Sequence, residues 1–94
     1  MDTIKPEEAQ IVGGLIIIDG RVKNDDQLNR IWSLIAGTLI KIATADNGWE
    51  QLYRDPGDGR FWELYFPHGE MQGGGPPALR VVSPDTVKQK YRLS

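Results

Sequence analysis

A loop signal near the middle of the chain constrains the fold more than any other feature. The residues Asp-Pro-Gly-Asp-Gly at positions 55–59 separate two segments rich in aromatic residues, 49–54 and 60–66. Each of these loop residue types favours turns for its own physical reason. Aromatic residues, in contrast, are enriched in strands. The pattern therefore predicts a central β-hairpin formed by the two segments.

Alternation along the two strands sorts this hairpin into two faces, if the loop pairs Arg54 with Arg60. The face expected to form the core carries Glu50, Leu52, Trp62, Leu64 and Phe66. The other face carries Trp49, Gln51, Tyr53, Phe61, Glu63 and Tyr65. A shift of one residue in the strand register would exchange the two faces.

The longest predicted helix starts after the residues 24–26, Asn-Asp-Asp, which supply N-cap oxygens and negative charge. Apolar residues then recur at steps of three and four, as expected for one face of a helix. They are Leu28, Ile31, Ile35, Leu39 and Ile42. The pattern predicts a helix that ends near Thr44, with Gly37 as a weak point inside it.

The remaining segments predict short elements around this centre. Residues 11–18 form a strand that turns at Asp19-Gly20 and returns at 21–23, and Gly13-Gly14 marks a bulge or a close backbone approach. Residues 78–82 form another strand, and Ser83-Pro84-Asp85 starts a short helix over 87–91. The expected fold class is α+β, an antiparallel sheet of four or five strands packed on one long helix, with a short C-terminal helix.

Length and composition favour a small binding protein. The 94 residues are expected to form one domain over 1–94, with 1–9 as a polar tail or short lead-in. The absence of cysteine and the single histidine, His68, predict no metal site and no cofactor. The net charge of −2 predicts no nucleic-acid partner. We expect no membrane segment and no signal peptide, and hence a cytoplasmic protein.

The second face of the hairpin is the candidate binding site. Tyrosine and tryptophan dominate binding hot spots, and a large exposed apolar patch usually has a partner. Alternatively, the C-terminal segment folds back and covers this face. At the loop, Arg54, Asp55, Asp58 and Arg60 either hold the turn through ion pairs or supply specificity at the rim of an interface.

Other functions are weighed against binding. A small enzyme or ligand-binding protein would use Glu50, Glu63 and His68, but the two glutamates are expected on opposite faces of the hairpin. A third alternative is a structural module that homodimerises through its aromatic face. The glycines at 73–75 precede Pro76-Pro77 and a strand, so a connection is expected there rather than a phosphate-binding loop.

Several short motifs, taken in order, make the chain recognisable. They are Gly48-Trp49-Glu50, Leu52-Tyr53-Arg54-Asp55-Pro56, Asp58-Gly59-Arg60-Phe61-Trp62-Glu63-Leu64 and Gly73-Gly74-Gly75-Pro76-Pro77. Together they resemble the immunity protein 27 family of bacterial polymorphic toxin systems over roughly residues 14–91.

The resemblance implies an α+β protein that binds the effector domain of a cognate toxin inside the producing cell and blocks it. The residues assigned to partner binding are Trp49, Gln51, Tyr53, Arg54, Asp55, Asp58, Arg60, Phe61, Glu63 and Tyr65. A monomer or a weak homodimer is expected, with no catalytic residues.

Overall fold

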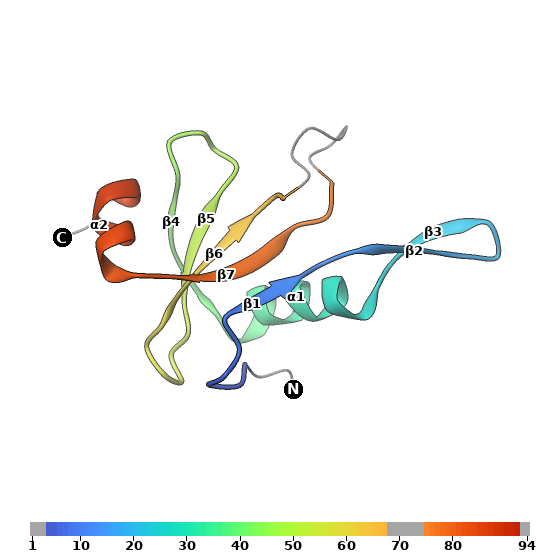
Figure 1. Cartoon of the computed structure of the whole chain (residues 1–94), viewed down its shortest axis with the longest axis horizontal. Coiled ribbons are helices and arrows are strands. Elements are labelled where there is room, and N and C mark those ends of the chain that lie inside the picture. The colour runs from blue at the N-terminus through green and yellow to red at the C-terminus, as the bar shows by residue number, and fades with distance from the viewer. Residues whose placement is uncertain (1–3, 68–74, 93–94) are drawn as a thin grey trace.

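The computed structural model describes residues 4–67 and 75–92. Within these ranges the strands are β1 (Gln10–Val12), β2 (Leu15–Ile18), β3 (Arg21–Asn24), β4 (Ile40–Thr44), β5 (Gln51–Arg54), β6 (Phe61–Tyr65) and β7 (Ala78–Val82). The helices are α1 (Asp26–Gly37) and α2 (Pro84–Tyr91). Figure 1 shows how these elements follow one another along the chain.

Five of the strands form one antiparallel sheet with the spatial order β1-β7-β6-β5-β4, and β2 and β3 form a separate hairpin. The fold is therefore α+β, as the sequence predicts, with five strands in the main sheet. Neither helix of the described residues has an apolar run long enough to cross a membrane.

Helix α1 begins as predicted but ends earlier. The carboxylate of Asp25 accepts a hydrogen bond from the Leu28 N–H at 2.8 Å and so caps the helix. The helix ends at Gly37, and the predicted continuation to Thr44 is wrong, because residues 40–44 form β4. Glycine weakens a helix, and the β-branched residues at alternate positions of 40–44 suit a strand better.

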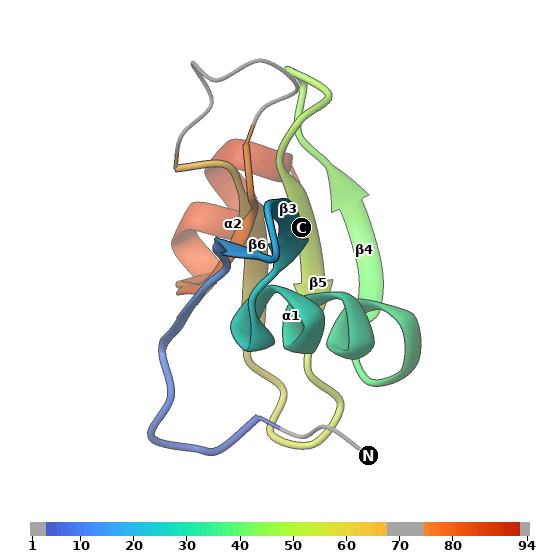
Figure 2. The ribbon, with the colours of Figure 1, turned by 90° about the vertical axis from the view of Figure 1, so that its right-hand side faces the viewer.

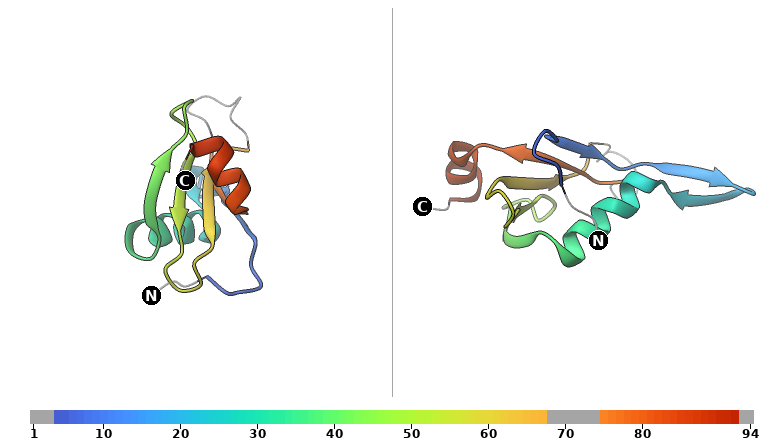
Figure 3. Two further views of the ribbon diagram at one scale, coloured as in Figure 1. Left: turned by 90° about the vertical axis from the view of Figure 1, so that its left-hand side faces the viewer. Right: turned by 90° about the horizontal axis from the view of Figure 1, so that it is seen from below.

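Both faces of the main sheet are covered by a helix. On one face, Ile31 and Leu34 of α1 pack in a core with Ile11, Leu39, Tyr53, Trp62, Leu64 and Leu79. On the other face, Val87 and Tyr91 of α2 pack with Ala45 and Leu52. Figure 2 shows α1 in front of the sheet, and the left view of Figure 3 shows α2 in front and α1 behind. Each face of the sheet therefore uses part of its surface for internal packing, while β4 at one edge keeps Ile40 and Ile42 exposed.

The register of the central hairpin differs by one residue from the prediction. Arg54 pairs with Phe61 rather than with Arg60. The backbone N–H of Asp55 donates to the Arg60 carbonyl at 2.9 Å, so the ladder continues one pair further toward a tighter loop. The predicted grouping of the β5 residues with the β6 residues is therefore wrong, although Leu52, Trp62 and Leu64 are buried as predicted. Tyr53 shares the α1 face with Trp62, and Leu52 shares the α2 face with Glu63.

The segment before α1 forms an extended arm. Asp19 and Gly20 have φ angles of 52° and 75°, which fit the predicted two-residue turn between β2 and β3. This hairpin projects away from the rest of the molecule and makes the longest dimension 48 Å (Figures 1 and 3). The predicted strand over 11–18 is interrupted at Gly13-Gly14, which separates β1 from β2.

Gly13 lies where the backbone approaches a neighbouring segment, as predicted. Its N–H donates to the Pro77 carbonyl oxygen at 3.1 Å. A Cβ at this position would lie 2.5 Å from that oxygen and 3.0 Å from Cδ1 of Leu28. Because the nearest atom belongs to the backbone, a side chain here requires the arm to shift.

We expect Gly13→Ala to lower the free energy of unfolding by about 1–3 kcal/mol, because the added methyl group overlaps the Pro77 carbonyl. Gly37→Ala is the matched control. A Cβ there meets no atom within 4 Å, so this change should raise the free energy of unfolding by up to about 1 kcal/mol. Urea unfolding measures both. Equal stability of the Gly13→Ala variant and the native chain would contradict the close approach.

Candidate functional site

Glu63 lies in the middle of the sheet and is the most buried charged residue on the α2 face, with 1% of its surface exposed. Its Oε1 accepts hydrogen bonds from Nε and Nη2 of Arg80 at 2.9 and 2.6 Å. Its Oε2 accepts one from the Tyr91 hydroxyl at 2.7 Å and lies 2.8 Å from Nζ of Lys90. Both carboxylate oxygens are therefore satisfied, as burial of a charge requires.

These contacts fix the protonation states of the cluster. Burial acts to raise the pKa of Glu63, but hydrogen bonds from Lys90, Tyr91 and Arg80 outweigh it and lower the pKa. Burial acts to lower the pKa of Lys90, whereas Glu50 and Glu63 raise it above its usual value. Burial and the bond to Glu63 raise the pKa of Tyr91. At neutral pH the carboxylate and the ammonium group are charged and the phenol keeps its proton.

Glu50, the residue before β5, joins the same cluster. Nζ of Lys90 lies 2.8 Å from Oε1 of Glu50, and Nη2 of Arg80 lies 3.6 Å from Oε2. The prediction that Glu50 and Glu63 point to opposite faces is therefore wrong, because Lys90 bridges the two carboxylates. Acid–base catalysis by paired carboxylates needs one group with a raised pKa, whereas the pKa of Glu63 is lowered. The geometry is that of an anchor for α2.

The residues that the structure describes do not form a metal site. Among them, His, Cys, Asp and Glu side chains do not gather in groups of three that could hold a metal ion. His68, the third residue of the enzymatic alternative, and the predicted glycine connection at 73–74 lie outside the described residues.

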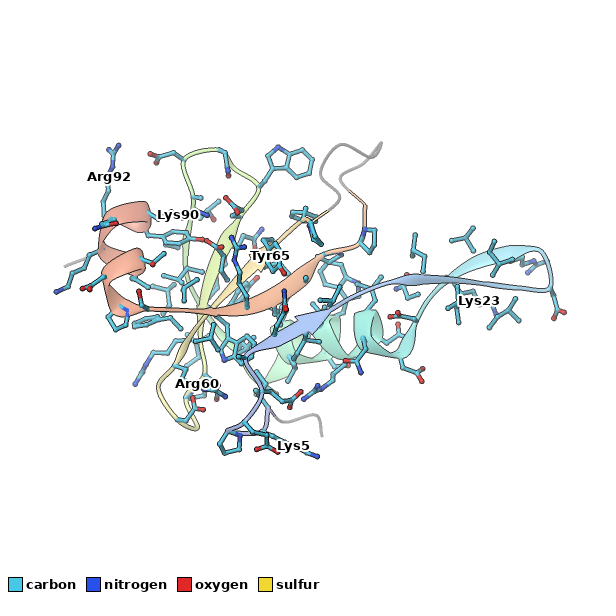
Figure 4. All side chains as sticks on the ribbon, in the orientation of Figure 1. Lys5, Lys23, Arg60, Tyr65, Lys90 and Arg92 are labelled. Carbon is cyan, nitrogen blue, oxygen red and sulfur yellow. The ribbon has the colours of Figure 1, made fainter. Side chains whose placement is uncertain are left out.

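Tyr65 lies beside the same cluster and is half-buried. The guanidinium carbon of Arg80 lies 4.1 Å from the centre of the Tyr65 ring, a cation–π arrangement. The Tyr65 hydroxyl accepts a hydrogen bond from the side-chain amide of Gln10 on the edge strand β1. Tyr65 and Lys90, labelled in Figure 4, approach the centre of the sheet from different elements. Arg80 thus connects the buried carboxylate to a ring at the surface.

The most exposed aromatic residue of the central hairpin is Trp49, with 53% of its surface accessible. It forms a hollow of about 320 Å³ together with Asn47, Glu50 and Phe66, which we call the Trp49 pocket. The rings of Trp49 and Phe66 meet edge to face, with centroids 5.6 Å apart. Aromatic walls beside a carboxylate suit a ligand with both apolar and basic groups.

A tight turn holds Trp49 in this exposed position. The side-chain oxygen of Asn47 accepts hydrogen bonds from the backbone N–H groups of Trp49 and Glu50, at 2.9 and 3.3 Å. Its amide nitrogen donates to Oε1 of Glu50 at 3.0 Å. Gly48 has a φ of +78°, a conformation that glycine adopts without strain. The tryptophan is therefore presented by an ordered turn, which limits the entropy lost on binding.

At the opposite end of the hairpin, the charged loop residues hold the turn. Asp55 is buried, and its Oδ1 accepts a hydrogen bond from the Gly57 N–H at 2.8 Å. Asp58 Oδ2 lies 2.6 Å from Nε of Arg60. Arg60 also donates to the backbone carbonyls of Lys5 and Glu8, which ties the N-terminal segment to the loop (Figure 4). The turn-holding interpretation of the sequence therefore fits this geometry.

Glu8 attaches the N-terminal segment to α1 as well. Its Oε1 lies 2.6 Å from Nη2 of Arg30 on α1, and its Oε2 accepts a bond from Nη1 at 2.7 Å. Hydrogen bonds from the Arg30 side chain and the Lys5 backbone lower the pKa of Glu8 to about 2. Residues 5–8 therefore contact both α1 and the central hairpin.

A second shallow hollow, of about 300 Å³, lies beside this loop. Its lining includes three residues assigned to partner binding from the sequence, Asp58, Arg60 and Phe61. The other walls come from the end of β7 and the start of α2, at 81–84. The hollow therefore joins the loop to the element that covers the α2 face.

The structure divides the predicted binding residues into two groups. Tyr53 and Glu63 are buried, with 4% and 1% of their surfaces exposed, so their assignment to an exposed face is corrected. Asp55, which was assigned to the loop, is also buried, with 6% of its surface exposed. Tyr53 donates its hydroxyl proton to Oε1 of Gln51 at 2.8 Å inside the α1 face. The residues that keep accessible surface are Trp49, Gln51, Arg54, Asp58, Arg60, Phe61 and Tyr65.

The sequence analysis did not identify the residues that surround Trp49 and Glu63. Asn47 and Phe66 line the Trp49 pocket. The Asn47-Gly48 pair before Trp49 is a turn signal that could have indicated Asn47. Arg80, Lys90 and Tyr91 surround Glu63, but they lie far along the chain from it. The strand register places Arg80 opposite Glu63, and the packing of α2 on the sheet brings Lys90 and Tyr91 to it. The sequence offers no local signal for either arrangement.

Known proteins match this chain in two ways. The model of the family described as immunity protein 27 matches residues 17–83. The chain is also similar to segments of alanine–tRNA ligases, with 38% identity over 71 residues in Hyphomonas neptunium, 39% over 73 in Paracoccus denitrificans and 37% over 73 in Granulibacter bethesdensis. These matches cover 71–73% of the chain but only 8% of each ligase. No solved structure matches.

The anchoring role of Glu63 can be tested by stability. We expect Glu63→Gln to lower the free energy of unfolding at neutral pH by about 2–3 kcal/mol, because Arg80, Lys90 and Tyr91 lose bonds to a buried charged acceptor. Glu50→Gln is the matched control. It should cost about 1 kcal/mol, because Lys90 keeps its bond to Glu63.

The pH dependence provides a second measurement. The folded-state pKa of Glu63 lies below its ordinary value of 4.5, so its contribution is complete above that pH and is lost as the pH falls through the folded-state pKa. Urea unfolding of the native chain should therefore show stability falling in acid, and the Glu63→Gln variant should show a shallower fall. The same slope in both proteins would contradict an ionised anchor.

Proposed function

The chain belongs to the immunity protein 27 family, and on this premise we propose that it neutralises a bacterial toxin by binding the toxin's effector domain. The family match over residues 17–83 carries this proposal. The action is stoichiometric and not catalytic. It takes place in the cytoplasm of the bacterium that makes both proteins, where the toxin would otherwise act.

Occlusion is the mechanism that this fold supports best. Both faces of the sheet are used for internal packing, so recognition falls to the ends of the central hairpin. At one end, the Trp49 pocket offers two aromatic rings and a carboxylate on an ordered turn. A buried aromatic anchor surrounded by polar groups is the usual composition of an interface hot spot.

The opposite end of the hairpin supplies the rim of the proposed interface. Asp58, Arg60 and Phe61 line the second hollow, and Arg54 is exposed beside them. Because Arg60 already pairs with Asp58, it gives specificity more than affinity. Tyr65 and Gln51 lie between the two ends and are part-exposed.

The Trp49 pocket fits a basic side chain of the toxin. An arginine or lysine placed over Trp49 would gain a cation–π interaction, and Glu50 would give it a counter-charge. Glu50 already contacts Lys90, so the incoming cation would share this carboxylate. The net charge of −2 also favours a basic toxin surface, although weakly.

A second candidate function comes from the similarity to alanine–tRNA ligases. On this view the chain is a module that binds tRNA. The structure offers only a small basic surface for tRNA, because Arg80 pairs with Glu63 and Lys90 pairs with Glu50. Lys88 and Arg92 remain exposed on α2 and after it, and Arg92 lies 3.4 Å from Asp46. The charge therefore favours the toxin-binding proposal.

The main proposal predicts that Trp49→Ala weakens toxin binding by at least about 2 kcal/mol, as loss of a hot-spot anchor does. A cognate toxin domain is the probe, with affinity measured by calorimetry and protection measured by co-expression. Trp32→Ala is the matched control, because Trp32 is also exposed, at 44%, but lies on α1. Full protection by the Trp49→Ala variant would refute the assignment of this pocket.

A mobility-shift assay with purified bacterial tRNA separates the two candidates. The main proposal predicts no retention of tRNA at physiological salt, because a chain with net charge −2 releases few counterions on binding. Retention that falls steeply as salt increases would support the tRNA-binding candidate instead.

A further inference from the structure

The β2–β3 hairpin carries the largest group of exposed aliphatic residues in the described part of the chain. Ile17 and Val22 are 75% and 66% exposed, and Leu15, Ile16 and Ile18 are each between 42% and 47% exposed. The hairpin extends beyond the body of the protein, where no other element covers it (Figures 1 and 3). Exposed apolar surface of this kind on a small protein marks an interaction site.

A two-stranded hairpin is marginally stable alone in water, and a sheet needs three or more strands for stability of its own. The β2–β3 hairpin lacks a third strand, since each of its strands has only one neighbour. Each strand therefore has one edge that no strand of the described residues pairs with. The composition of the two free edges decides which edge a further strand joins.

The two edges differ in charge. β3 contains Arg21 and Lys23, and charged residues on an edge strand oppose pairing with another strand. β2 has the sequence Leu-Ile-Ile-Ile, with no charge and no proline. The outer edge of β2 is therefore the open one.

The direction of the backbone groups on β2 follows from a neighbouring hydrogen bond. The N–H of Asp25 donates to the Gly14 carbonyl at 3.0 Å, so positions 14 and 25 form a hydrogen-bonded pair that continues the β2–β3 register. Bonded and non-bonded pairs alternate in an antiparallel ladder. The N–H and C=O groups of Leu15 and Ile17 therefore point to the free edge, and those of Ile16 point to β3.

We propose that β2 pairs antiparallel with β2 of a second copy of this chain, about a two-fold axis at Ile16. Leu15 of each copy then lies opposite Ile17 of the other, so all four outward-pointing residues exchange backbone hydrogen bonds. The aliphatic side chains of Leu15, Ile17 and Val22 from both copies share one face, because this register preserves the alternation of the hairpin.

The charge pattern favours a second copy as the occupant. β2 has no charges, so two copies meet along this edge without repulsion. The resulting four-stranded sheet has the order β3-β2-β2-β3, and both of its outer edges carry Arg21 and Lys23. The assembly therefore closes as a dimer and does not extend into a fibre. This inference does not depend on toxin binding.

Proline variants test the pairing. Ile17→Pro removes an N–H that points to the β2 edge, and we expect the dissociation constant of the dimer to rise at least about 100-fold, roughly tenfold for each of the two bonds lost. Val22→Pro is the matched control, since Val22 is opposite Ile17 and its N–H points to the other edge. Light scattering across a concentration series should show the native chain and the Val22→Pro variant approaching twice the monomer mass of 10.5 kDa.

A native chain that stays monomeric at all concentrations overturns the proposal and leaves the β2 edge for a different protein. Loss of the dimer in both proline variants also overturns it, because the contact would then not be specific to β2.

A cysteine pair tests the register independently of any proline effect on folding. The chain has no cysteine, so Ile16→Cys introduces one thiol per copy. Residues on the two-fold axis would form a non-hydrogen-bonded pair with Cα atoms about 4.5 Å apart, within disulfide range. Mild oxidation should therefore link this variant into a dimer. Val22→Cys should not link, because three strand spacings, about 14 Å, separate the two outer strands. Equal linking of both variants would contradict the register.

Discussion

The buried carboxylate of Glu63 determines how this small protein uses its sheet. A charge in the middle of a sheet is costly unless it is paired and hydrogen-bonded. Arg80 meets this need from the neighbouring strand, and Lys90 and Tyr91 meet it from α2. Two of the three partners lie in the last turn of an eight-residue helix that would be marginal alone. The charge cluster and the small apolar contact of Val87 and Tyr91 together fix α2 on the sheet.

This arrangement limits where the protein can recognise a partner. α1 covers one face of the sheet and α2 covers the other, so aromatic residues in the strands are largely used for internal packing. The Asn47-Gly48 turn instead places Trp49 beyond the end of the sheet, next to Phe66 and Glu50. Glu50 belongs to the same charge cluster as Glu63, so the pocket and the anchor of α2 are connected through Lys90. The element that completes the fold thus also positions the proposed binding surface.

Local sequence signals predicted the elements well and their relative positions poorly. The Asp19-Gly20 turn, the Asp25 cap and the Ser83-Pro84 start of α2 depend on nearby residues, and all three are confirmed. The predicted extension of the long helix to Thr44 was wrong, because the apolar residues at 39–42 fit the period of a helix as well as that of a strand. Only the helix-weakening Gly37 favours the strand. The predicted register of the central hairpin was wrong by one residue, because the backbone hydrogen bond between Asp55 and Arg60 shortens the loop. Since alternation has a period of two, that single step moved the β5 residues to the other face relative to β6, so that Tyr53 packs with Trp62 and Leu52 lies opposite Glu63.

The most direct test of the proposed binding surface is hydrogen exchange of the chain with and without its proposed partner, a cognate toxin domain. The account predicts that binding slows exchange at the amides of 47–50 and beside Phe66, while the amides of α1 exchange at the same rate in both states. Protection confined to α1 and β4, with no change around Trp49, would contradict the proposed binding surface.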